Sequence, residues 1–396
     1  LLIGEENTID PAMLRLYHLK PDEFLQKHWQ KKPLFIKAGF TPDALGQIEA
    51  ADLCELVEDP ALYSRLVTHD RSLKSYKVAL GPFTKRRLKS AAKGKWTLLL
   101  NGLDRIEPVF QEFFRPFGFL PHWRKDDIMV SLSSDGAGVG PHFDEYDVFL
   151  LQLAGKKRWG LSAAPLENPK LVDGVDLRLL AGFKPETEHV AEPGDILYVP
   201  PKFAHHGVAS GESITLSVGF RAPQWKGLLT SWVDAVTGKL DDKRFYTDPQ
   251  LTPTAHPGRI DKDAINLIKQ TLLSSLNELD FDDWFVRMLS EPVDEVQAVT
   301  GKKTMSESKL QQFLEAGGEL VKAPNCRMYY REDAPHLAYI NAQVMNLESE
   351  ETAVFVRLCD SWRIGASDLA QNSKQLLQVK FLAKLLKAGF IEPAED

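Results

Sequence analysis

The stretch from Asp127 to Phe220 places the strongest limit on the fold, because strand-like runs follow one another there without helices between them. Runs rich in β-branched and aliphatic residues lie at 128–133, 147–153, 196–199 and 214–220. Parallel strands need a long crossover, usually a helix, whereas antiparallel strands are joined by short turns. We therefore predict a mainly β core, in the form of an antiparallel barrel or sandwich.

Three glycines within this region, Gly136, Gly138 and Gly140, invite comparison with a nucleotide-binding loop. They lead into a proline and a strand-like run, whereas a nucleotide-binding loop opens a helix. The third glycine also comes one residue too early for the dinucleotide fingerprint. We therefore exclude a Rossmann fold.

Helical periodicity begins after the β core. Apolar residues with helical spacing run from Trp225 to Leu240, and a second apolar stripe runs from Ile265 to Leu276. An apolar helix face has to be buried, so these helices pack either on their own barrel or against another subunit.

A length of 396 residues corresponds to two or three domains at about 150 residues each. We divide the chain into a β core at 1–223, a helical region at 224–300 and a C-terminal domain at 301–396. The last segment mixes helices with strand-like runs, one of them at Val354–Leu358, and its final helix ends at Gly389. This alternation is typical of a winged-helix-like α+β domain. Its 12 basic and 13 acidic residues argue against a DNA-binding role.

The charge balance and the cysteines limit the classes of partner and compartment. The formal net charge of −7 gives no positive field for gripping nucleic acid, whereas a basic protein partner is electrostatically compatible. No apolar run approaches the roughly 18 residues of a membrane span, so we expect no membrane insertion. The three cysteines, Cys54, Cys326 and Cys359, are far apart, which favours the reducing cytoplasm.

A candidate metal site begins with His142-Phe143-Asp144. On a β-strand, residues i and i+2 project from the same face, so His142 and Asp144 can bind one ion. About sixty residues later, a turn, a strand and a double-proline bend deliver His205 and His206. Strand alternation allows only one of this pair to face the ion, and either one completes a set of two histidines and one carboxylate. That set suits non-haem Fe(II) with positions open for O₂ and a co-substrate.

These motifs resemble a known family. His142-x-Asp144 after a glycine-rich turn, followed by Pro-Gly-Asp-Ile-Leu-Tyr-Val-Pro-Pro at 193–201 and a later histidine, is similar to the JmjC branch of the cupin-fold 2-oxoglutarate oxygenases. The segments 24–33 and 217–223 resemble, more narrowly, the bacterial ribosomal oxygenases. The resemblance implies a double-stranded β-helix core, a helical homodimerisation region and a C-terminal winged-helix-like domain. It also implies Fe(II)- and 2-oxoglutarate-dependent hydroxylation of an arginine side chain in a large-subunit ribosomal protein, ribosomal protein sixteen.

The resemblance also assigns residues. It implies His142, Asp144 and His205 as metal ligands, because His205 lies in a Pro-x-Phe-x-His pattern like that of the family. A buried 2-oxoglutarate carboxylate needs a cation and a hydroxyl. Among the cations of Gly155-Lys156-Lys157-Arg158 the resemblance selects Lys157, and it gives Ser133 as the hydroxyl. Tyr146 and Ser217 are candidate substrate contacts because they lie near the motifs.

Other functions remain open at this point. The same chemistry can act on histidine or demethylate a methylated lysine. A cupin-like binding or assembly protein can use the same triad to hold a structural ion. Loss of turnover on replacing His142 or Asp144 indicates the enzyme, and loss of folding or partner binding indicates the assembly protein.

Overall fold

We describe the fold from a computed structural model. It covers residues 16, 18–41, 48–69, 76–91, 93–173, 177–293, 304–324 and 326–394. Within them, no helix is long and apolar enough to cross a membrane.

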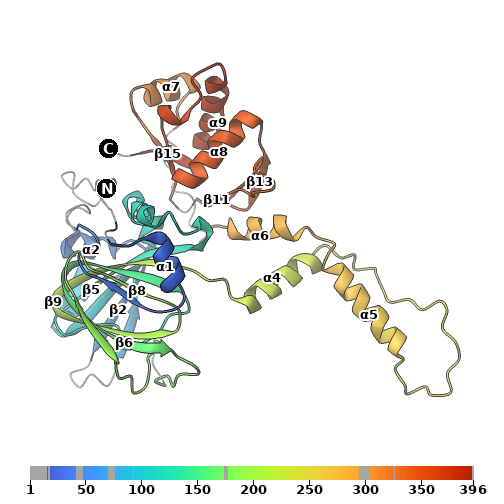
Figure 1. The fold of residues 1–396 in the computed structure, drawn as a ribbon, viewed down its shortest axis with the longest axis horizontal. Helices are drawn as coiled ribbons and strands as arrows, with labels where there is room; N and C mark the ends of the chain where they lie inside the picture. Colours follow the sequence, from blue (N-terminus) through green and yellow to red (C-terminus); the bar gives the residue numbers. More distant parts are fainter. Residues whose placement is uncertain are drawn as a thin grey trace.

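One antiparallel sheet of nine strands forms the core, which confirms the predicted antiparallel β architecture (Figure 1). Neighbours along its main path, in spatial order, are β1 (Leu34–Ile36), β8 (Ile196–Val199), β6 (Asp147–Pro165), β9 (Phe203–Phe220), β5 (Lys125–Ser133), β4 (Lys95–Asn101), β2 (Tyr63–His69) and β3 (Tyr76–Leu80). Strand β7 (Thr187–Ala191) pairs with β6 off this path. The sheet curls because β6 and β9 are long, and their pairing shifts register between Gln152 and Lys156.

The register shift changes which residues of β6 face inward. Val148 and Leu150 share one apolar cluster with Trp159 and Leu161, so inward positions are even-numbered before the shift and odd-numbered after it. Gly155 lies in this bulge with φ +63°, and a Cβ there would lie 1.9 Å from the carbonyl oxygen of Glu212. A glycine is therefore required on both conformational and steric grounds.

The other face of the sheet carries the main core, which is rich in aromatic side chains. Helix α1 (Pro21–Lys27) places Phe24 there, and the short helix η3 (Pro108–Phe117) places Phe117 against Phe149 with ring centroids 4.5 Å apart. The remaining N-terminal helices are α2 (Ala50–Leu56), α3 (Lys85–Ala91), η2 (Leu103–Arg105) and η4 (His122–Arg124). This packing holds the sheet rigid behind its polar inner face.

Three helices follow the sheet: α4 (Trp225–Thr237), α5 (Lys262–Ser275) and α6 (Phe281–Leu289). The two predicted amphipathic helices correspond to α4 and α5. Trp232 and Trp284 join α4 to α6 with ring centroids 4.8 Å apart. Helices α4 and α5 extend away from the barrel in Figure 1, so the described part of their own barrel does not cover them.

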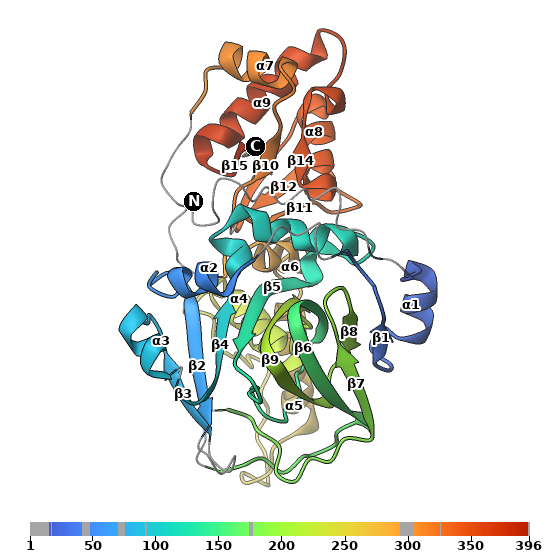
Figure 2. The same cartoon turned by 90° about the vertical axis from the view of Figure 1, so that its left-hand side faces the viewer.

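The C-terminal part forms a separate α+β unit with its own hydrophobic core (Figure 2). Its elements are α7 (Glu307–Glu315), β10 (Leu320–Lys322), β11 (Met328–Tyr329), β12 (Leu337–Ile340), β13 (Gln343–Asn346), α8 (Ser349–Ser361), β14 (Arg363–Ile364), η5 (Ala366–Asp368), α9 (Lys374–Ala388) and β15 (Ile391–Pro393). Gly389 ends α9 at φ +77°, as predicted. The predicted strand at Val354–Leu358 was wrong, because Val354, Phe355, Leu358 and Cys359 form the buried face of α8. The domain limits at 223 and 300 stay a prediction.

Candidate functional site

The segment that carries His142 and Asp144 is irregular backbone ahead of β6, rather than the regular strand that the sequence suggested. A single bridge ties it to β9: the His142 N–H donates to the His205 carbonyl at 3.0 Å, and the His205 N–H donates back at 2.8 Å. The glycine-rich turn permits this approach, since a Cβ on Gly138 would lie 2.0 Å from the Gly207 carbonyl oxygen. The turn therefore positions two histidines that are far apart in sequence.

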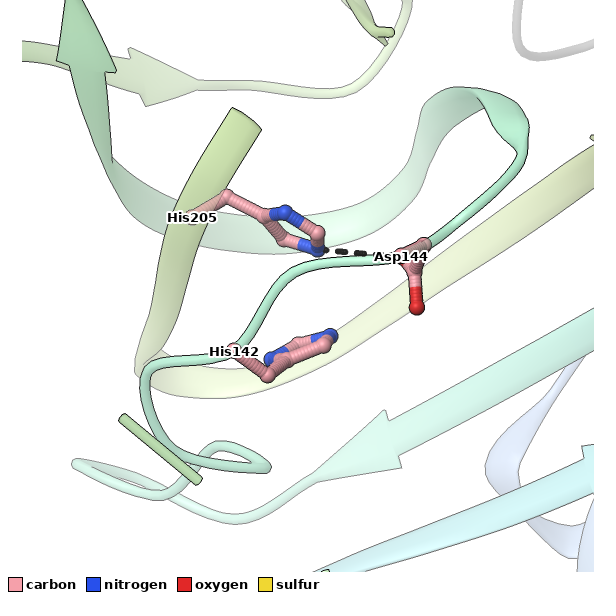
Figure 3. Close-up of side chains that lie close together, drawn as sticks. All are labelled: His142, Asp144 and His205. Carbon is pink, nitrogen blue, oxygen red and sulfur yellow. Dashed lines mark ion pairs between the residues drawn. The ribbon is translucent and has the colours of Figure 1, made fainter. Parts of the chain in front are cut away.

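His142, Asp144 and His205 converge on one point, and their ligand atoms all lie within 4.8 Å of one another. Figure 3 shows the three side chains pointing into the same space, with Nε2 of His205 3.5 Å from Oδ2 of Asp144. Nδ1 of His142 lies 2.8 Å from the Gly140 carbonyl oxygen, and Nδ1 of His205 lies 3.1 Å from that of Phe203. Protons on both Nδ1 atoms satisfy these carbonyls and leave both Nε2 lone pairs for a metal.

Electrostatics also prepare His205 for a metal. Its side chain is almost fully buried, and burial together with the neighbouring His142 lowers its pKa to about 4. The imidazole is therefore neutral near pH 7 and available as a ligand. His206 is the next residue along β9 and pairs with Gly160, whereas His205 pairs with Leu161. Adjacent strand residues face opposite ways, and among the described residues only His205 of the two joins the metal-ligand cluster.

Lys157 lies deep on the inner face of the sheet, 3% exposed. Its Nζ donates to Oγ of Ser131 at 3.2 Å and to Oγ1 of Thr215 at 3.4 Å. Burial lowers the pKa of Lys157 to about 8. The Lys157 Nζ is also 5.1 Å from the Trp159 ring, whose centroid is 6.0 Å from that of His205. One indole thus separates a buried cation from a metal-ligand histidine.

The remaining predicted site residues, Ser133, Ser217 and Tyr146, make no hydrogen bond to Lys157 in the described part of the chain. Ser133 is buried, and its Oγ accepts from Thr97 at 3.1 Å, so the hydroxyl beside Lys157 belongs to Ser131, one pleat away on the same face. Ser217 is buried on β9, two residues beyond Thr215. Tyr146 is mostly enclosed, and burial with the charge of Asp144 raises the pKa of its phenol well above the ordinary value.

Sequence reasoning missed Ser131, Thr215 and Gln152. Gln152 Oε1 accepts from Thr215 at 3.1 Å and thereby orients the hydroxyl that contacts Lys157. A signal was present: Ser131, Ser133, Ser213, Thr215 and Ser217 alternate with aliphatic residues in β5 and β9. Such polar alternation along two paired strands indicates a polar inner face.

The donor set of the cluster indicates which metal it can hold. Two neutral imidazoles and one carboxylate on one side of a point, with no fourth His, Cys, Asp or Glu in the cluster among the described residues, leave positions free for other ligands. This is the facial arrangement of non-haem Fe(II) oxygenases, so the triad fits an iron site.

Comparisons with known proteins identify the family. Residues 112–228 match the JmjC domain and residues 268–392 match the ROXA-like winged helix. The ribosomal protein uL16 3-hydroxylase of Escherichia coli K12 is 31% identical over 336 residues, covering 82% of this chain and 88% of that protein. The chain belongs to the JmjC ribosomal oxygenases. The family expected from the sequence motifs is thereby confirmed.

Further relatives agree across nearly the whole chain. The "Probable ribosomal oxygenase" of Haemophilus influenzae is 30% identical, covering 90% of this chain and 91% of that protein. The X-ray structure of E. coli YcfD superimposes with a TM-score of 0.82 at 28% identity and covers 96% of this chain and all of its own. Another YcfD structure, in complex with cobalt and 2-oxoglutarate, has a TM-score of 0.78. The JmjC/cupin fold and the winged helix are confirmed, as is the enzyme class of 2-oxoglutarate-dependent oxygenase.

Proposed function

We propose that this oxygenase uses Fe(II), 2-oxoglutarate and O₂ to hydroxylate an arginine side chain of ribosomal protein uL16. The convergence of His142, Asp144 and His205 beside the buried Lys157 carries the proposal. The 31% identical relative from E. coli is named for the 3-hydroxylation of uL16. A basic ribosomal protein is also compatible with this chain's net charge of −7.

The three side chains would hold the iron together, through the Nε2 atoms of His142 and His205 and one carboxylate oxygen of Asp144. Iron bound there supplies the activation of O₂ that is coupled to oxidation of 2-oxoglutarate. The Gly140 and Phe203 carbonyls fix the orientation of both imidazoles through their Nδ1 protons.

Lys157 binds the distal carboxylate of 2-oxoglutarate. Its ammonium is already oriented by the Ser131 and Thr215 hydroxyls, so the carboxylate gains a cation and hydroxyl donors on entering. A buried carboxylate without such partners is strongly disfavoured, which gives this site its selectivity for a dicarboxylate. Ser133 supports the same wall from one pleat away through its contact with Thr97.

Acidic residues near Tyr146 favour a cationic side chain as substrate. Of the carboxylates that act on the Tyr146 phenol, Asp144 is assigned to the iron and Asp126 pairs with Arg221, which leaves Asp127. The Asp127 carboxylate would attract a guanidinium. We assign Tyr146 and Ser217 to substrate contact. Relatives named as lysine demethylases and histidyl hydroxylases match about a third of this chain or less, which favours arginine over these alternatives.

The proposal also includes the oligomeric state and the compartment of the protein. The chain forms a homodimer through the helical region 224–300, because Trp225 is 84% exposed and Leu229 is 61% exposed on α4. It acts in the cytoplasm, where unpaired cysteines stay reduced and ribosomal proteins are made. We expect no nucleic-acid partner, because the net charge of −7 gives no positive field for one.

Mass spectrometry of the product tests the function. The purified protein with Fe(II) and 2-oxoglutarate is incubated with ribosomal proteins of the same organism, and His142→Ala is the control. One added oxygen on a single uL16 arginine, absent with His142→Ala, is the expected result. Consumption of 2-oxoglutarate with oxygen on a histidine, or loss of a lysine methyl group, contradicts the arginine assignment. An iron-loaded protein that consumes no 2-oxoglutarate and modifies no protein contradicts the catalytic function and favours a binding protein.

A further inference from the structure

A polar cavity lined by none of the triad residues lies between the barrel and the winged helix. Its volume is about 60 Å³. The barrel side contributes Arg105 and Lys125, and the C-terminal domain contributes Lys322, Arg327 and Trp362. Figure 2 shows β11 of this domain next to the short helices at the end of the sheet. Both domains therefore build the walls of this cavity.

Positive charge exceeds negative charge around the cavity. Four cationic side chains line it, whereas the carboxylates that line it belong to Asp104 and Asp126. Asp126 Oδ1 already pairs with Arg221 Nη2 at 3.2 Å. Glu112 is near, but it is bound by Arg363 at 2.7 Å. The neighbouring carboxylates are therefore fewer than the cations, and two of them already pair with arginines outside the cavity lining.

Two lysines from different domains meet at one indole. Nζ of Lys125 is 3.6 Å from the centroid of the Trp362 ring, and Nζ of Lys322 is 4.1 Å from it. Within the described chain, neither ammonium has a hydrogen bond to an oxygen or an ion pair. Burial, followed by the charge of Lys322, lowers the pKa of Lys125 well below its ordinary value, and burial lowers that of Lys322. Both side chains are only partly exposed, and ring contacts alone do not offset the repulsion of two like charges at one indole.

We propose that this cavity binds a small oxyanion of the size and charge of phosphate, held by Lys125 and Lys322 with help from Arg327. The anion supplies the acceptor atoms that both ammonium groups lack. Because its ligands come from both domains, it fastens the winged helix to the oxygenase barrel. The two sources of such an anion are free inorganic phosphate and the phosphoryl group of a nucleotide.

Thermal unfolding and calorimetry of the full-length protein test this site. With 10 mM inorganic phosphate, compared with chloride at equal ionic strength, we expect the Tm to rise by about 3 °C or more. Lys322→Met and Lys125→Met should abolish the rise and weaken phosphate binding at least about tenfold, because each removes one of the two cations. Lys384→Met is the matched control, since Lys384 is exposed on α9 and its loss should leave the rise intact.

The variants also report on the unliganded state. Without phosphate, Lys322→Met should have a Tm equal to or above that of the native chain, since it removes one of two neighbouring like charges. Titration with AMP identifies the source: binding equal to that of phosphate indicates a phosphoryl group, and weaker binding indicates the free ion. Equal Tm values in phosphate and chloride, or a rise that Lys322→Met retains, would overturn the proposal.

Discussion

His142 and His205 are joined by two backbone hydrogen bonds, of 3.0 and 2.8 Å, although 62 residues lie between them in the chain. The metal-ligand pair is therefore fixed by the main chain rather than by the ion. A site of this kind is organised before the metal arrives and loses little conformational entropy on binding it. The loop that carries His142 is accordingly as important to the site as the ligands.

The first prediction concerns that loop. Gly138→Ala puts a Cβ 2.0 Å from the Gly207 carbonyl oxygen, so the loop must move away from β9. We expect a loss of about 1–3 kcal/mol in the free energy of unfolding. We also expect weaker metal binding, because the displaced loop would strain the two backbone hydrogen bonds between His142 and His205. Denaturant unfolding and Co(II) titration measure both effects.

Gly258→Ala provides the control for the loop variant. A Cβ at Gly258 meets nothing within 4 Å, so its substitution should change neither quantity by more than about 0.5 kcal/mol. Native-like metal affinity in Gly138→Ala would show that the bridge does not position the ligands.

The second prediction separates the adjacent histidines of β9. His205→Ala should lose metal binding and turnover by more than the 10- to 100-fold typical of outer-shell partners. His206→Ala should keep the metal, because His206 is not part of the ligand cluster. The measurements are the metal stoichiometry and the 2-oxoglutarate turnover of the two variants. Loss of metal in His206→Ala, with metal retained in His205→Ala, would assign the third ligand to His206.

The third prediction is a pH dependence of 2-oxoglutarate binding. Burial lowers the pKa of Lys157 to about 8 in the unliganded protein, and binding of the carboxylate requires the charged ammonium. Above a pH of about 8, the Lys157 ammonium of the free protein loses its proton. The Kd for 2-oxoglutarate should therefore rise about tenfold per pH unit. Below that pH the ammonium is already formed, and the Kd should be flat. Calorimetry between pH 6.5 and about 9.5 follows the transition.

Lys157→Arg is the matched control for this titration. The guanidinium stays charged across the range, so its Kd should not change between these pH values. A Kd that rises equally in Lys157→Arg assigns the pH dependence to another group.

The fourth prediction concerns the proposed homodimer. Leu229→Glu puts a charge on the exposed apolar face of α4 and should shift the molecular mass in solution from dimer to monomer. Leu80→Glu is the control, because Leu80 is equally exposed at 61% but lies on strand β3 of the barrel. Light scattering after size exclusion measures the mass. A dimer that survives Leu229→Glu, or a monomeric native chain, contradicts the assignment.

Local patterns in the sequence were sufficient for much of the fold. The strand-like runs at 147–153 and 214–220 lie in β6 and β9, and the apolar spacing from Trp225 lies in α4. These signals work because strand and helix periods are properties of neighbouring residues. His142 and Asp144 were predictable as a pair from their spacing, although they lie on irregular backbone and not on a regular strand. The residues alone left His205 and His206 open as the third ligand, and the resemblance selected His205.

Other features depend on contacts between distant segments. Lys157 was selected over Lys156 by resemblance alone, because strict alternation along β6 does not survive the bulge. Ser131 was missed since nothing local distinguishes it from Ser133 on the same face. The strand predicted at Val354–Leu358 failed because Val354, Phe355 and Leu358 pack on one face of α8, where tertiary burial outweighs intrinsic preference.

The bulge in β6 makes the chemistry of the barrel sensitive to chain length at one point. Val148 and Leu150 lie before it, and Trp159 and Leu161 lie after it, all in one cluster. Deleting the extra residue of the bulge would restore strict alternation and leave Lys157 inward, whereas deleting Lys156 with the bulge kept would turn Lys157 to solvent and bring Arg158 inward. Relatives that lack one residue just after the bulge would therefore present a different cation to the barrel, even where the aligned letters match.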